Sequence, residues 1–115
     1  IFIDGGFKND YGDNNNNLAF LHIEEYSTSD GIFFQTNGAW SNTGKLQDNN
    51  WYTFDIEMQS SSGTLTLDGT ISVTRTTNLP AATLQPAFKL LNRLGGTTAR
   101  MKYCEAYNTW PHYTN

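Results

Sequence analysis

Two short segments of this chain carry acidic or histidine side chains at alternate positions, the spacing that places side chains on one face of a β-strand. In the first, Asp55 and Glu57 stand two residues apart, so their Cβ atoms would lie about 7 Å apart on one face. That geometry suits acid–base chemistry or the binding of a cation. It is equally typical of the solvated face of an ordinary strand, and the sequence leaves both interpretations open.

The second segment, Leu18–Glu25, reads LAFLHIEE. Alternation predicts that Ala19, Leu21 and Ile23 face a core, while Phe20, His22 and Glu24 share the opposite face. Glu25 would then point toward the core, where a carboxylate needs a partner unless a bulge changes the register.

Oxygen ligands concentrate in Asn9–Asn17, NDYGDNNNN. Calcium binds six to eight oxygens, and Asp10 and Asp13 are the candidate ligands, with Asn15 a further oxygen donor. The spacing lacks the D-x-[DN]-x-[DN]-G pattern of calcium loops, so an asparagine-rich loop without a metal is the alternative. We expect no cofactor, with calcium as the one alternative.

The other reactive side chains form no recognisable motif. The histidines, His22 and His112, lie far apart in the sequence, which argues against a shared metal site. Cys104 is the single cysteine, so there is no disulfide framework within the chain and no cysteine-based zinc site. A buried structural thiol is expected there.

Tryptophans are the remaining candidates for recognition. Trp40 lies in the Gly/Asn-rich segment NGAWSN, and Trp110 lies in NTWPHY. Such side chains stack on sugar rings, anchor a protein interface or pack locally, and all three roles stay open. Trp51 is expected to pack at a sheet edge.

Composition limits the function classes. The chain has 115 residues, a net charge of −4 and 16% charged residues, and a single domain over residues 1–115 is expected. The negative charge argues against a nucleic-acid partner, and no apolar run reaches the length of a membrane helix. A Thr/Asn-rich, Lys-poor composition favours a place outside the cytoplasm. Because the sequence opens at Ile1 within an expected strand, it indicates a processed protein or a piece of a longer one.

The elements that would position these residues are short strands separated by turn clusters, which predicts an antiparallel sandwich or barrel. Pro86 interrupts the single helix candidate, 81–91. The expected strands are Ile1–Ile3, Leu18–Tyr26, Gly31–Gln35, Trp51–Met58, Thr64–Leu67, Thr70–Arg75, Gln85–Leu91 and Met101–Tyr107.

The stretch Trp51–Thr70, with its continuation to Val73, shows the pattern best. Asp68-Gly69 supplies the positive φ angles of a tight turn between two alternating runs. The side chains expected inside are Tyr52, Phe54, Ile56, Met58, Leu65, Leu67, Ile71 and Val73.

This stretch, together with the closing segment Met101–Asn108 (MKYCEAYN), resembles the concanavalin A-like/laminin-G-like jelly rolls, and more distantly the laminarinase/lichenase-type β-glucanases. The resemblance implies an all-β jelly-roll sandwich, and laminin-G-like modules often hold calcium in their loops. Such domains usually run longer. Further strands would lie outside this chain, or neighbouring subunits would complete the sheets.

In the resembling glucanases, the strand matching Leu18–Glu24 carries acids at alternate positions, and retaining hydrolysis needs two carboxyl groups. Here those positions hold Phe20, His22 and Glu24. The resemblance therefore implies a jelly roll without that activity, unless a distant residue such as Asp55 or Glu105 supplies a second acid.

The sequence thus predicts a non-catalytic recognition or structural module outside the cytoplasm, bound to a glycan or a protein surface and to other subunits of an assembly. A virion component (phage tail or capsid) or a surface appendage fits this description. The alternatives are a divergent glycan-cleaving enzyme, hydrolase or lyase, and a purely structural subunit that buries Trp40 and Trp110. The expected ligand-binding residues share one concave face and its rim: Phe20, His22, Glu24, Trp40, Asp55 and Glu57.

Overall fold

The computed structural model describes residues 2–12, 14–24, 31–46 and 51–91. All the regular elements in these residues are β-strands, in agreement with the predicted all-β class. They are β1 (Phe2–Lys8), β2 (Leu18–Glu24), β3 (Gly31–Thr36), β4 (Ala39–Asn42), β5 (Phe54–Met58), β6 (Gly63–Leu67), β7 (Ile71–Arg75) and β8 (Gln85–Leu91).

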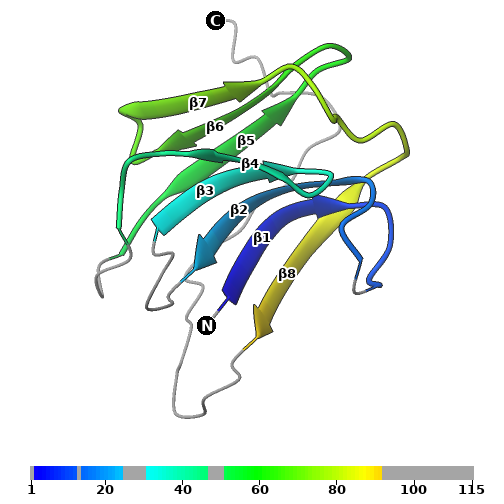
Figure 1. Ribbon diagram of the computed structural model, residues 1–115, viewed down its shortest axis with the longest axis horizontal. Coiled ribbons are helices and arrows are strands. Elements are labelled where there is room, and N and C mark those ends of the chain that lie inside the picture. Colours follow the sequence, from blue (N-terminus) through cyan, green and yellow to red (C-terminus); the bar gives the residue numbers. More distant parts are fainter. Residues whose placement is uncertain (1, 13, 25–30, 47–50, 92–115) are drawn as a thin grey trace, which may run out of the picture.

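The strands form two antiparallel sheets that pack face to face (Figure 1). The larger sheet has the order β4-β3-β2-β1-β8, and the smaller has the order β5-β6-β7. Between the sheets, β5 contacts β2 and β7 contacts β4. The smaller sheet is therefore centred over β2, β3 and β4, and β1 and β8 extend beyond it.

A small apolar core fills the space between the sheets. Leu21 and Phe34 from the larger sheet meet Leu65 and Leu67 from the smaller one. Phe34, Leu65 and Leu67 are completely buried, and burial of each such side chain contributes about 1.5–3 kcal/mol. A polar bridge joins the sheets beside this core: the Arg75 guanidinium donates hydrogen bonds to Thr36 Oγ1 and Ser41 Oγ, each at 2.6 Å.

The predicted interior of the smaller sheet is confirmed in β6 and corrected at the start of β5. Phe54 is 38% exposed, because β5 lies at the edge of its sheet among the described strands. The tip of the Phe54 ring lies near Gly5 of β1. Trp51, expected to pack at a sheet edge, is 63% exposed and precedes the strand. Thr53, the residue before β5, is held by Asp68: the backbone amide of Thr53 donates a 2.8 Å hydrogen bond to the Asp68 carboxylate.

Two hairpin turns have the positive φ angles that their Asp-Gly and Asn-Gly pairs favour. Asp68 and Gly69 have φ angles of 51° and 68°, as predicted for the turn between β6 and β7. Asn37 and Gly38 have φ angles of 46° and 82° and join β3 to β4. The sequence interpretation treated this Asn-Gly pair as the start of a long turn, although Asn-Gly between two runs is a strong hairpin signal.

The predicted strands at the two ends of the described chain differ in how well they match the structure. The first strand does not end at Ile3 but continues to Lys8, because β1 pairs along its whole length with both β2 and β8. The predicted strand Gln85–Leu91 is confirmed as β8, and the helix candidate over 81–91 does not form. Pro86 is tolerated there because β8 is an edge strand. The expected strand Met101–Tyr107 lies outside the described residues.

Candidate functional site

The predicted ligand-binding residues fall on two opposite outer surfaces. In β2, Ala19 and Leu21 belong to the core, so Phe20, His22 and Glu24 point away from the smaller sheet. In β5, Ile56 and Met58 pack against the core. The two carboxylates of that strand therefore point outward on the other side of the sandwich. The expectation of one shared face is wrong, since alternation fixes the side of a strand but not the sheet to which the strand belongs.

A histidine between two carboxylates occupies the outer face of the larger sheet. Antiparallel pairing sets Asp4 of β1 directly opposite His22 of β2. The Asp4 carboxylate hydrogen-bonds to His22 Nδ1. Glu24 Oε1 lies 3.6 Å from His22 Nε2, on the opposite edge of the ring. All three residues are buried, with exposed fractions of 8% for Asp4 and 5% for the other two.

This array fixes the imidazole. Asp4 holds the Nδ1 edge of the ring and Glu24 faces the Nε2 edge, so the orientation of the ring is set from both sides. The imidazole stands between the carboxylates, so they do not converge on one point. Among the described residues, no group of three His, Cys, Asp or Glu side chains is arranged to hold a metal ion.

Two aromatic side chains from β3 and β4 cover His22. The Trp40 indole centroid lies 4.6 Å from the His22 ring at an interplanar angle of 40°. Phe33 lies 5.5 Å from Trp40 and 6.3 Å from His22. Trp40 is 44% exposed. The result is an indole that is open to solvent on a buried, charged support.

Asp4 is the functional candidate that sequence reasoning missed. The first strand was ended at Ile3, since Asp4-Gly5-Gly6 shows no apolar alternation. The sequence therefore predicted one carboxylate on this face, Glu24, because only the acids of β2 were considered. Apolar and polar residues alternate only weakly in Phe2–Lys8. The acid at Asp4, between apolar Ile3 and the glycines, was the one local sign of a polar outward position.

The outer face of the smaller sheet is different in kind. Asp55 and Glu57 are exposed, and Glu57 accepts a 3.2 Å hydrogen bond from the Gln59 amide. Beside them runs a ladder of hydroxyl pairs across β6 and β7, Thr64 with Thr74 at 3.0 Å and Thr66 with Ser72 at 3.1 Å. This is the solvated strand face that the sequence left as one alternative.

The loop after β1 is organised by a lysine. Lys8 is 3% exposed, and its ammonium donates to Asp10 Oδ1 at 2.8 Å and to Asn14 Oδ1 at 3.0 Å. Hydrogen bonding to this ammonium, and then to the Gly12 amide, lowers the pKa of Asp10 below its ordinary value of 3.8. A calcium ion at Asp10 would have to share the carboxylate with that ammonium. Asp13, the other predicted ligand, lies outside the described residues.

Several further candidates also lie outside the described residues: Glu25, Cys104, Glu105, Trp110 and His112. Within the residues that the structure does describe, no helix is long and apolar enough to cross a membrane.

Comparison of this chain with protein-family models, with curated proteins and with solved structures finds no match. The jelly-roll resemblance therefore stays a prediction.

Proposed function

We propose that this chain is a non-catalytic recognition module of the concanavalin A-like/laminin-G-like jelly-roll type that binds a glycan on the outer face of its larger sheet. Trp40 is the stacking platform, and the polar groups beneath and beside it orient the sugar hydroxyls. The module acts outside the cytoplasm, on a virion or a cell surface, as one part of a larger assembly. The Thr/Asn-rich, Lys-poor composition and the resemblance to laminin-G-like modules support this setting.

The single observation that carries the proposal is the support of Trp40. The indole is 44% exposed, yet it rests on a histidine ring that Asp4 holds in place. A half-exposed aromatic with a fixed orientation is a preorganised surface for the C–H face of a sugar, because little conformational freedom remains to be lost on binding. A tryptophan that served only the core would instead be covered.

A glycan array followed by calorimetric titration tests the proposal. Trp40→Ala should weaken binding of the best glycan by about 1–3 kcal/mol, the usual effect of removing an anchor residue. Trp51→Ala is the matched control, since Trp51 is also exposed but lies at the start of the smaller sheet. That variant should bind as the wild type does. Absence of binding to any glycan would leave the structural-subunit alternative in place.

One observation favours glycan cleavage as the second candidate. Asp4 and Glu24 give this face two carboxylates around one imidazole, which the sequence interpretation lacked. Acid–base catalysis of glycan cleavage uses such groups. Measurable product release from a polysaccharide that disappears in both Asp4→Asn and Glu24→Gln would replace the binding proposal with this one.

A further inference from the structure

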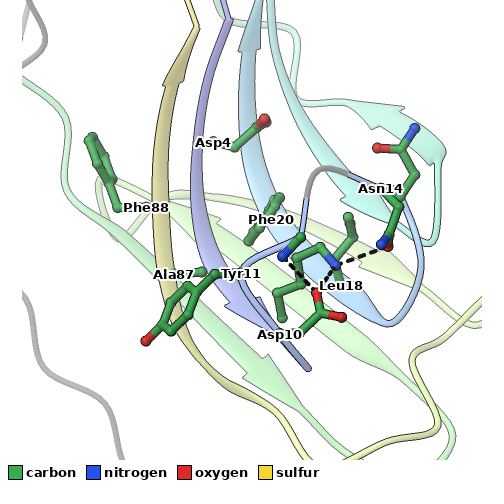
Figure 2. Close-up of a pocket in the computed structure, with 11 residues that line it drawn as sticks. Asp4, Asp10, Tyr11, Asn14, Leu18, Phe20, Ala87 and Phe88 are labelled. Atoms are coloured by element: carbon green, nitrogen blue, oxygen red, sulfur yellow. Dashed lines mark hydrogen bonds and ion pairs between the residues drawn. The ribbon is translucent and has the colours of Figure 1, made fainter.

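A cavity of about 290 Å³ opens on the same outer face, at the end where β1, β2 and β8 meet the loop after β1 (Figure 2). Its walls include Asp4 and Lys8 from β1 and Phe20 from β2. The residue paired with Gly6 of β1 on β8 is Ala87, whose small side chain also lines the cavity.

The wall on the loop side is preformed. The Lys8 ammonium donates to Asp10, Asn14 and the Asn16 carbonyl, at 2.8, 3.0 and 3.3 Å, which uses its three hydrogens. Asp10 Oδ1 also accepts from the Gly12 amide, and Asn14 Oδ1 from the Asn16 amide. These hydrogen bonds tie the described residues of the loop to Lys8 without a ligand, which lowers the entropic cost of binding one.

The lining combines aromatic rings with amide groups and with the paired charges of Lys8 and Asp10. Tyr11 is 78% exposed, and Figure 2 shows its ring beside Ala87, with Asp10 and Asn14 on the loop. The one ammonium is already neutralised by Asp10, so the cavity is not built for a phosphate. An aromatic ring with amide and carboxylate oxygens beside it is the chemistry that binds a neutral, hydroxylated ring.

We propose that this cavity is a second subsite for a single sugar ring, which stacks on Tyr11 and hydrogen-bonds to Asp10 and Asn14. Its volume lies near the lower end of the range of about 300–1,000 Å³ for small-molecule sites, which fits one ring. The inference rests on the proposed glycan binding and deepens it.

The position of the cavity then determines the length of the glycan. Trp40 and Ala87 lie in one row of paired residues that crosses the whole larger sheet: Trp40, Gln35, Phe20, Gly6 and Ala87. Four strand spacings separate the two ends of this row, roughly 19 Å. A ligand that reaches both Trp40 and Tyr11 is therefore an oligosaccharide of several units that runs across the strands.

The test compares short and long probes, cellobiose and laminaribiose against cellohexaose and laminarihexaose, by calorimetric titration. Ala87→Leu fills the cavity and Tyr11→Ala removes its stacking surface. Each should weaken binding of the better hexasaccharide about tenfold, and leave the disaccharide unchanged. Trp40→Ala should weaken both lengths. Tyr11→Ala alone decides the matter where Ala87→Leu lowers the unfolding temperature, because Tyr11 is largely exposed.

Hexasaccharide affinity equal to that of the wild type in Tyr11→Ala would overturn the second subsite. The proposed function would survive that result, provided that Trp40→Ala still weakens binding. Failure of the wild-type chain to bind any of the four probes or any array glycan would overturn both.

Discussion

The two outer faces of this sandwich differ although their sequences alternate in the same way. The outward residues of β2, Phe20, His22 and Glu24, are each 5% exposed, whereas Asp55 and Glu57 of β5 are exposed. The difference follows from position in the sheet. Strand β2 has a neighbour on each side, while β5 lies at the edge of its sheet among the described strands. Polar groups on an inner strand find partners across the ladder, and those on an edge strand meet water.

The comparison also separates two kinds of carboxylate. Asp4 is buried and bonded to a ring that a tryptophan covers. Asp55 stands beside a row of hydroxyl groups that water can reach. A buried charge is costly to leave without its partner, and an exposed one is not. A surface that binds ligands needs side chains held in place, which is what the first arrangement supplies.

The largest expected effect is on His22. His22→Ala removes the partner of buried Asp4 and the support of Trp40, so it should lower the free energy of unfolding by about 3–5 kcal/mol. Asp55→Ala, on the other face, should stay within about 0.5 kcal/mol of the wild type, as surface substitutions do. Urea unfolding of both variants measures the contrast. Equal, small effects would show that the array on the larger sheet contributes no more than an exposed strand face.

A second prediction concerns neighbouring positions of the smaller sheet. Phe54 and Leu67 are paired across β5 and β6, but Leu67 is fully buried and Phe54 is 38% exposed. Leu67→Ala should cost about 2–5 kcal/mol, the usual range for a core leucine. Phe54→Ala should cost less than Leu67→Ala, although phenylalanine is the larger side chain. Thermal and urea unfolding of the two variants decide this, and the reverse order would mean that the edge of β5 is covered in solution.

Sequence reasoning identified the strands wherever apolar alternation was strong. It located Leu18–Glu24 and the β6–β7 hairpin, together with the outward side of His22. It ended β1 too early, since Asp4-Gly5-Gly6 forms a strand only through pairing with β2 and β8. Asp4 was missed with it. Asp4 reaches His22 only through the pairing of β1 with β2, and such pairing leaves no local pattern in the sequence.

The smallest expected effect is on the pH dependence of stability, through Asp10, an exposed carboxylate paired with the Lys8 ammonium. Its pKa is lowered in the folded chain, so the folded state favours the ionised form more than the unfolded state does. The stabilising contribution is therefore fully present above the ordinary pKa of 3.8 and is lost as the pH falls through the lowered value. The difference in unfolding free energy between wild type and Asp10→Asn should be constant at neutral pH and shrink in this acidic range.

Lys8→Met gives the control for that measurement, because it removes the ammonium that is the main cause of the lowered pKa. In that background, Asp10→Asn should change stability much less at neutral pH than it does in the wild type. Asp55→Asn removes an exposed carboxylate that stands on the outer face of the smaller sheet, away from this loop. If Asp10→Asn and Asp55→Asn change the unfolding free energy equally as the pH falls, the pairing of Asp10 with Lys8 is contradicted. The hydrogen-bonded loop wall of the cavity would then be contradicted as well.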